Sequence, residues 1–299
     1  MKNAYIFPGQ GSQHPGMGQQ LFDQYDKAKE LFRQADEILG YAISDVMFHG
    51  TEEQLKQTKY TQLAMFLHGY VAYECLREAE PDMTAGHSLG EYTALTAAGC
   101  LRFEDALRLV EKRANAMQKA CELEPSGMAV VLKFEDKIIE EVCASITEEV
   151  VVPANYNSQQ QLVISGSLKG LELATDKLKE AGAKRIMMLN VGGAFHSPLM
   201  QTAQDELAEA IEKCTFSHPI CPVYQNVNAS ATTEPDMIRR NLVAQLTSPV
   251  RWTQTVLNMV QDGAGLFVEF GPAPTLGNLV KRIVPGIEPQ CLGADKENE

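Results

Sequence analysis

Hydrophobic positions in the first 120 residues follow two patterns: short continuous runs and helical spacing. Short apolar runs at residues 3–7 (NAYIF) and 83–88 (MTAGHS) predict buried strands, the first followed by a glycine-rich loop. Apolar positions with helical spacing predict helices over residues 20–39, 60–79, 89–98 and 103–120. Strands that alternate with helices are typical of a parallel sheet covered on both faces. The pattern therefore predicts an α/β fold.

A different order of elements begins near residue 126. Apolar runs predict strands over 127–132, 150–157, 161–167 and 185–191, and helical periodicity predicts helices over 135–146 and 168–182. The resulting order, β-α-β-β-α-β, is that of the ferredoxin-like unit. Residues 265–272 (GLFVEFGP) read as a strand that returns to the first sheet. We therefore expect a ferredoxin-like subdomain, 126–191, inserted into a larger domain formed by 1–125 and 192–299.

Composition narrows the function classes. The formal net charge is −13, so the chain lacks the basic surface that nucleic acids or anionic membranes require. Seven cysteines without a C-x-x-C pair argue against a disulfide framework or a zinc site. The N-terminal apolar run is too short for a signal peptide, and no segment approaches the roughly 20 apolar residues of a membrane span. We expect a cytoplasmic protein without a metal, with a frayed acidic tail (ADKENE).

A serine lies in the pattern G-x-S-x-G at residues 86–90, between a predicted strand and a predicted helix. In a nucleophile elbow, this turn presents the serine at the helix N-terminus, and the glycines allow close backbone approach. Free N–H groups and the partial positive charge of the helix end favour a developing oxyanion there. Ser88 is therefore predicted to be a nucleophile; the alternative is a serine that only caps the helix.

Six histidines are candidates for the base. His196 lies in a glycine-rich turn (GGAFHSPLM) after a predicted strand, and catalytic groups gather at strand ends in open α/β sheets. His87 is adjacent to Ser88, so its side chain should point away from the serine oxygen. His196 is the predicted base, and His14 is the alternative. The others are expected in the core or at the surface: His68, His49 and His218. No acid can be nominated to orient the base, so the orienting group is either hidden or a backbone carbonyl.

Arg113 is the most informative charge in the sequence. Winding residues 103–120 at about 100° per residue places it in the middle of the apolar arc of its helix. A buried guanidinium is costly unless a carboxylate or phosphate pairs with it. The partner is either an internal Asp or Glu, in a structural ion pair, or the carboxylate of a substrate bound bidentately.

Several segments together resemble the malonyl-CoA:acyl carrier protein transacylases of bacterial fatty acid synthesis, within the acyltransferase superfamily. They occur in that family's order and cover about residues 8–282: FPGQGSQ, GHSLGEYTAL, KRANAMQKA, ANYNS, GAFHSPLM and PVRW. The resemblance implies an α/β-hydrolase-like large domain with an inserted ferredoxin-like domain. It also implies malonyl-CoA as substrate and an acyl carrier protein as partner, with no metal or redox cofactor.

The resemblance also implies roles for individual residues. Ser88 matches the nucleophile and His196 the base, while Arg113 matches the arginine that grips the malonyl carboxylate. Further matches are the oxyanion-hole N–H groups of Gln10 and Leu89, the histidine-orienting backbone carbonyl of Gln245, and the cleft asparagines Asn155 and Asn157. Phe195 resembles the malonyl-preferring form of its motif.

Other functions remain open at this point. A trans-acting polyketide acyltransferase or an acyl-carrier-protein hydrolase could use the same pair of residues, and a non-catalytic scaffold would be a protein of another class. An intact Ser88, His196 and Gln10 argue against the scaffold, and Arg113 argues against the hydrolase. Lys184–Arg185 and Lys281–Arg282 are candidate docking patches for an acidic carrier protein; the alternative is scattered surface charge.

Overall fold

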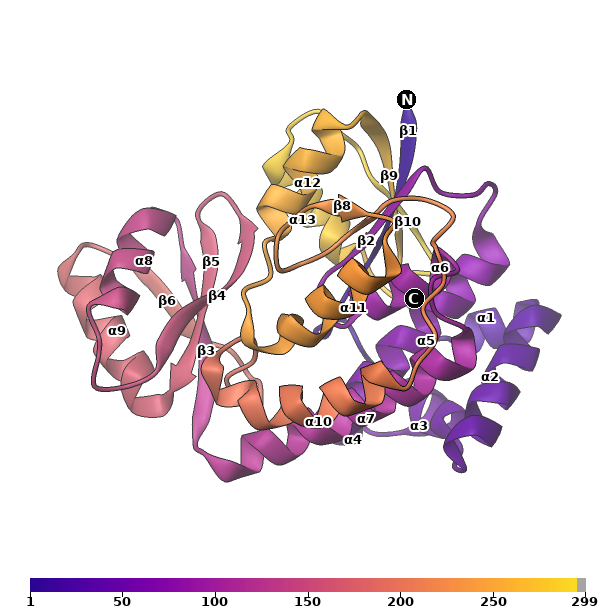
Figure 1. Cartoon of the computed structure of the whole chain (residues 1–299), viewed down its shortest axis with the longest axis horizontal. Coiled ribbons are helices and arrows are strands. Elements are labelled where there is room, and N and C mark those ends of the chain that lie inside the picture. The colour runs from indigo at the N-terminus through magenta and orange to yellow at the C-terminus, as the bar shows by residue number, and fades with distance from the viewer. Residues whose placement is uncertain (295–299) are drawn as a thin grey trace.

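The computed structural model describes residues 1–294 and contains two sheets (Figure 1). The larger sheet has the strand order β10-β9-β1-β2-β7-β8. Its strands are β1 (Lys2–Phe7), β2 (Met83–Gly86), β7 (Val223–Tyr224), β8 (Ala231–Thr232), β9 (Ala264–Phe270) and β10 (Gln290–Leu292). All neighbours in it are parallel except β7 and β8. The predicted α/β class is confirmed, and the strand predicted at 265–272 does pair with β1.

Alternate side chains of β1 enter different cores. Tyr5 and Phe7 belong to the cluster that contains the helices of the first half of the chain, whereas Ala4 and Ile6 belong to the cluster with α12 and α13. Because successive strand side chains point to opposite faces, this central strand must be apolar on both faces. The sheet is therefore covered on both sides, as Figure 1 shows for α12 and α13 on one side and α5 and α6 on the other.

The helices follow the predicted order with two differences: the first predicted helix is divided, and two short helices that the pattern did not predict lie between residues 43 and 56. The helices are α1 (Gln19–Gln24), α2 (Asp26–Leu39), α3 (Ile43–His49), α4 (Glu52–Lys56), α5 (Thr58–Leu76), α6 (Gly90–Ala97), α7 (Phe103–Leu123), α8 (Asp136–Ala144), α9 (Leu168–Glu180), α10 (Gln201–Glu212), α11 (Pro235–Ala244), α12 (Trp252–Gln261) and α13 (Thr275–Ile283). Two short 3₁₀ helices, η1 (Pro198–Met200) and η2 (Gln245–Thr247), complete the set.

The single helix predicted over 20–39 is wrong, because the chain breaks at Tyr25. Tyr25 is extended (φ −124°, ψ 122°), ends α1 and precedes α2. Asp26 then begins a second helix, where its negative charge favours the N-terminus and pairs with Lys29 at 2.9 Å. The break lets Phe22 pack edge-on against Phe32 and Phe48. Apolar periodicity continues across the break, so the pattern did not reveal it.

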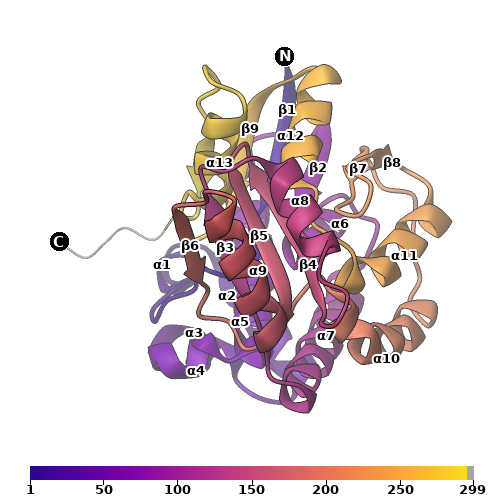
Figure 2. The same cartoon turned by 90° about the vertical axis from the view of Figure 1, so that its left-hand side faces the viewer.

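The smaller sheet has the order β4-β5-β3-β6, and all of its pairs are antiparallel. Its strands are β3 (Ser126–Leu132), β4 (Val151–Ser158), β5 (Gln161–Ser167) and β6 (Arg185–Met188). The predicted β-α-β-β-α-β order is confirmed, although β6 is shorter than expected. Figure 2 shows α8 and α9 in front of this sheet, and they pack on one of its faces. The division into domains at residues 126 and 191 stays a prediction.

Strand β4 ties the smaller sheet to the rest of the molecule. Backbone hydrogen bonds join Tyr156 N to Val250 O (2.9 Å) and Val250 N to Ala154 O (2.8 Å). Thr253 adds a side-chain hydrogen bond to Tyr156 O at 3.0 Å. Val250 follows η2 closely in sequence. The face of the smaller sheet that α8 and α9 leave uncovered is thus held opposite the ends of β1 and β2.

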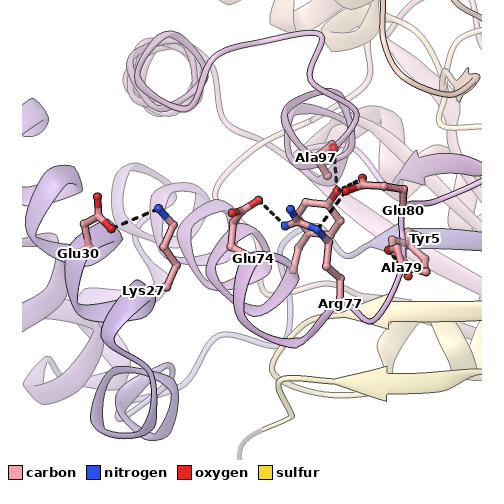
Figure 3. Close-up of polar contacts among 9 residues, drawn as sticks. Tyr5, Lys27, Glu30, Glu74, Arg77, Ala79, Glu80 and Ala97 are labelled. Carbon is pink, nitrogen blue, oxygen red and sulfur yellow. Dashed lines mark hydrogen bonds and ion pairs between the residues drawn. The ribbon is translucent and has the colours of Figure 1, made fainter.

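The connection from α5 to β2 is fixed by polar contacts (Figure 3). Arg77 lies over the ring of Tyr73, 4.4 Å from its centroid, and pairs with Glu74 at 2.6 Å. The Tyr73 hydroxyl donates to Ala97 O at 3.0 Å, and the Tyr5 hydroxyl donates to Ala79 O at 2.8 Å. These contacts join the segment that enters β2 to both α6 and β1. They fix the start of the strand whose other end carries Ser88.

None of the helices within residues 1–294 combines the length and the apolar character that a membrane crossing needs. The acidic tail that is expected to fray lies, from residue 295 on, outside the described residues.

Candidate active site

Ser88 occupies the predicted turn between β2 and α6. Its φ is +54°, a left-handed conformation that is unfavourable for a residue with a side chain. A Cβ at Gly86 would lie 1.9 Å from the backbone of Gly90, and one at Gly90 would lie 2.0 Å from Phe7 O. Only glycine fits at both positions. The strand–turn–helix geometry of a nucleophile elbow is therefore present at this serine.

His196 approaches Ser88 from the loop after β6. Its Nε2 lies 2.8 Å from Ser88 Oγ, and its Nδ1 lies 3.0 Å from Gln245 O and 3.2 Å from Ser248 O. Two carbonyl acceptors keep the proton on Nδ1, so Nε2 is free to accept the serine proton. Burial, and then the charge of Arg113, lower the pKa of His196 to about 3. The imidazole is therefore neutral near pH 7 and poised as a base.

The other histidines lie elsewhere. His87 bonds Asn157 (Nε2 to Oδ1, 2.9 Å), so it points away from the serine oxygen as predicted. His14 Nδ1 lies 3.2 Å from Ser12 O, whereas the histidine that bonds Ser88 Oγ is His196. His68 is fully buried, whereas His49 and His218 are exposed, as predicted. In residues 1–294 the hydrogen-bond partners of His196 Nδ1 are backbone carbonyls, which is the second of the two possibilities left open by the sequence.

Arg113 is completely buried on α7, as the apolar arc predicted. Its Nη1 donates to Gln62 Oε1 at 2.6 Å, and its Nη2 donates to Ser88 Oγ at 3.0 Å and to Gln245 Oε1 at 3.1 Å. Within residues 1–294 no carboxylate lies within 4.0 Å of it, so the structural ion pair is not formed. Burial lowers the pKa of Arg113, and the neighbouring Tyr92 and Glu91 oppose that shift. A guanidinium with no carboxylate within 4.0 Å in the described part of the chain therefore lies against the nucleophile.

Two backbone N–H groups belong to residues near the serine, at the ends of neighbouring strands. Gln10 follows β1, and Leu89 precedes α6. Across the described part of the chain, neither N–H donates to an intramolecular acceptor. The N–H of Ser88 is taken instead by Asn226 Oδ1 at 2.7 Å. The geometry thus leaves the pair Gln10 and Leu89 available as oxyanion donors, the role that the resemblance predicts for them.

A cavity of about 500 Å³ opens above Ser88. One wall comes from the ends of β1 and β2 and the His196 loop, and the facing wall comes from β3, β4 and β5. The wall of the smaller sheet contributes Met128, Asn155, Asn157, Gln161 and Val163. Leu189, Val191 and Phe195 add apolar surface, and α13 contributes Thr275, Leu276, Asn278, Leu279 and Arg282. Apolar surface with a few amide groups suits a flexible thioester arm better than a large charged ligand.

The two predicted docking patches differ in their surroundings. Arg282 lines the cavity and donates to Gln161 Oε1 at 2.7 Å. Its neighbour Lys281 pairs with Glu288 at 2.6 Å. Lys184 and Arg185 line a separate hollow at the edge of the smaller sheet. No cluster of His, Cys, Asp and Glu able to hold a metal occurs within residues 1–294.

Sequence reasoning missed three polar side chains that support the site. Gln62 joins Arg113 to Gln10, with Nε2 3.3 Å from Gln10 Oε1. Asn226 bonds the elbow, and the buried Glu91 bonds Asn226 N at 2.8 Å. Burial raises the pKa of Glu91 to about 7. None has a local signature: Gln62 lies on a mostly apolar, buried helix, and Asn226 lies 138 residues from Ser88.

Comparisons with known proteins define the class of this protein. A model of the acyl transferase domain matches residues 4–289, so the chain is an acyltransferase. The malonyl CoA-acyl carrier protein transacylase of Bacillus subtilis is 42% identical over 286 residues, covering 94% of this chain and 90% of the relative. The chain belongs to the malonyl CoA-acyl carrier protein transacylase family.

Solved structures agree as well. The malonyl CoA-acyl carrier protein transacylase of Coxiella burnetii has a TM-score of 0.94 and 39% identity, with 98% of this chain and 94% of that chain covered. A malonyl-transacylase in complex with its type II PKS acyl-carrier protein has a TM-score of 0.94 and 37% identity, with 99% and 97% covered.

Proposed function

We propose that this protein transfers the malonyl group of malonyl-CoA to the phosphopantetheine thiol of an acyl carrier protein, for fatty acid synthesis. The observation that carries the proposal is the buried Arg113, whose Nη2 lies 3.0 Å from Ser88 Oγ and which pairs with no carboxylate of residues 1–294. A guanidinium so placed selects an acyl group that ends in a carboxylate. The names of the relatives support the same substrate and partner.

In the first half-reaction, the malonyl carboxylate binds Arg113 and its thioester carbonyl lies over Ser88. His196 takes the hydroxyl proton as Ser88 Oγ attacks the carbonyl carbon. The tetrahedral oxyanion accepts hydrogen bonds from the N–H groups of Gln10 and Leu89, each worth about 10²–10³ in rate by analogy with measured deletions. The C–S bond then breaks, and His196 returns the proton to the thiolate of coenzyme A.

In the second half-reaction, the carrier thiol occupies the same cavity. His196 takes the thiol proton, and the sulfur attacks the malonyl-serine carbonyl. When the intermediate collapses, the ester C–O bond breaks and His196 returns the proton to Ser88 Oγ. Each half-reaction balances without a metal or redox cofactor, so malonyl-CoA is a substrate and no cofactor is required. The proposed location is the cytoplasm, the compartment of fatty acid synthesis.

A second candidate receives support from one comparison. The solved complex pairs a malonyl-transacylase with a carrier protein of type II polyketide synthesis. This site is compatible with a polyketide carrier protein, because the acyl group is transferred to the same phosphopantetheine thiol in either pathway. An acyl-carrier-protein hydrolase would use the same Ser88 and His196 but would have no need of the Arg113 guanidinium.

The proposal is tested by following the malonyl group on the protein by mass spectrometry. The protein is incubated with malonyl-CoA, and its intact mass is measured before and after addition of a holo carrier protein, an apo carrier protein or buffer alone. We expect one malonyl adduct that is stable in buffer and leaves only when the holo carrier is added. Rapid loss of the adduct in buffer would indicate a hydrolase, and absence of an adduct would refute the proposal.

A further inference from the structure

The backbone at Ser88 is strained and needs an external restraint. A non-glycine residue at φ +54° costs on the order of 1 kcal/mol or more and persists only where the surroundings impose it. The flanking glycines explain why the turn is sterically possible, but they add no attractive contact. Because Ser88 Oγ must lie 2.8 Å from His196 Nε2, relaxation of this φ would displace the nucleophile.

One side chain spans the turn. Asn226 Oδ1 accepts the N–H of Ser88 at 2.7 Å, and Asn226 Nδ2 donates to Gly86 O at 2.6 Å. These two groups belong to the residues on either side of His87, so a single side-chain amide bridges the two ends of the turn. Gln245 Nε2 holds the opposite side of the serine by donating to Ser88 O at 3.0 Å.

Asn226 is itself rigidly placed. It follows β7, which pairs in parallel with β2, so both the asparagine and the elbow lie at the same end of neighbouring strands. Its N–H donates to Glu91 Oε2 at 2.8 Å, and its carbonyl accepts the N–H of Arg251 at 3.1 Å. The side chain is 1% exposed. Because the backbone of Asn226 is held by two hydrogen bonds and the residue is buried, its side-chain amide is restricted to one orientation.

We propose that Asn226 is a positioning residue that holds the Ser88 elbow in its reactive conformation, an inference that rests on the proposed use of Ser88 as the nucleophile. It touches neither the acyl group nor the reacting oxygen. By occupying the N–H of Ser88, it also directs the oxyanion to the N–H groups of Gln10 and Leu89. Loss of Asn226 should therefore slow serine chemistry with every reagent, whether or not the reagent carries a carboxylate.

The test compares two adjacent buried amides. Asn226→Ala removes both contacts to the elbow, whereas Gln225→Ala removes a bond to Glu91 (Nε2 to Oε1, 3.1 Å) and none to the elbow. Both are measured for thermal stability, for the rate of Ser88 sulfonylation by phenylmethanesulfonyl fluoride, and for acylation by malonyl-CoA. Sulfonylation reports serine reactivity even if malonyl-CoA is not the substrate, so failure of the proposed function would be seen separately.

We expect Asn226→Ala to slow sulfonylation and maximal acylation by about 10²-fold per folded molecule, because small misplacements of a reacting group have effects of that size. The malonyl-CoA concentration for half-maximal acylation should change little, and Gln225→Ala should lose stability but keep its sulfonylation rate. Asn226→Asp, which keeps an acceptor for the Ser88 N–H, should be intermediate. If Asn226→Ala does not fold, Asn226→Asp should still react more slowly than Gln225→Ala. Equal sulfonylation rates for the position-226 and position-225 variants would overturn the proposal.

Discussion

The two walls of the cavity differ in how their polar groups are held. On the wall formed by the ends of β1 and β2, Ser88, His196 and Arg113 are joined to one another and to Gln245 by hydrogen bonds of 2.8–3.1 Å. On the wall of the smaller sheet, single contacts predominate, such as His87 to Asn157 at 2.9 Å. The difference suggests that the first wall performs chemistry, which needs fixed geometry, and that the second shapes a space for a flexible thioester arm.

The largest expected effect is at Arg113. Arg113→Ala should lower the rate of acylation by malonyl-CoA by about 10²-fold or more, since loss of one partner of a buried charge pair costs about 2–5 kcal/mol. Acylation by acetyl-CoA should fall less, because acetyl has no carboxylate and loses only the bonds by which Arg113 supports Ser88, Gln62 and Gln245. Arg108→Ala, on the same helix but paired with Glu104 at the surface, is the matched control. Equal losses with both thioesters would mean that Arg113 serves the nucleophile rather than the substrate.

Burial of His196 should make stability depend on pH. Its pKa is lowered to about 3 in the folded protein, against an ordinary value of 6.5. At this histidine the unfolded chain therefore binds more protons between these pH values, and the contribution of His196 to the free energy of unfolding falls as pH drops below 6.5. From pH 8 to pH 5 the loss is about 2 kcal/mol, at 1.36 kcal/mol per pKa unit.

Urea denaturation of wild type and His196→Gln at pH 8 and pH 5 measures this effect. The variant cannot take up the proton, so its stability relative to wild type should improve by about 2 kcal/mol at pH 5. A difference between the two proteins that is the same at both pH values would show that the imidazole is not desolvated in the folded state.

A smaller effect is expected on the facing wall. Asn157→Ala removes an amide that lines the cavity and, with it, the bond to His87. If this amide bonds the thioester arm, its loss costs about 1 kcal/mol, so KM for malonyl-CoA should rise about 5-fold while kcat changes little. Gln160→Ala, at the exposed turn between β4 and β5, is the control. A large fall in kcat with unchanged KM would show that the smaller-sheet wall also takes part in the chemistry, which would contradict the proposed difference between the two walls.

The smallest effect should separate the two cations of α13. Arg282→Ala removes a charge from the cavity rim, so KM for the carrier protein should rise a few-fold and lose part of its salt dependence. Lys281→Ala should leave KM unchanged, because Lys281 pairs with Glu288 at the surface. If Lys281→Ala has the larger effect, the carrier approaches over the surface of α13 rather than at the rim.

Features set by local sequence could be predicted. The elbow at Ser88 follows from glycine spacing between a strand and a helix, and the burial of Arg113 follows from its position on an apolar arc. The order of elements in the smaller sheet follows from alternation of the two apolar periods. Each of these signals is read from single elements or turns, within which side-chain periodicity determines which face is buried.

Features set by distant contacts could not be predicted. The backbone carbonyl that orients His196 carries no residue-type signature, so resemblance alone pointed to Gln245. Asn226 and Gln62 reach the site from other elements, and an isolated amide in a loop or an apolar helix looks like any other. The break at Tyr25 was hidden because apolar periodicity runs through it. Tertiary packing of Phe22 accompanies that break, and local pattern does not encode it.

The central claim is that Ser88 carries the malonyl group. The most direct measurement is to acylate the protein with malonyl-CoA, quench it in acid, digest it with pepsin and locate the adduct by peptide mass spectrometry, with Ser88→Ala in parallel. We predict one malonyl adduct, on Ser88 in the wild-type protein, and no adduct in Ser88→Ala. A malonyl adduct on a cysteine or another residue, or an undiminished adduct in Ser88→Ala, would contradict the account.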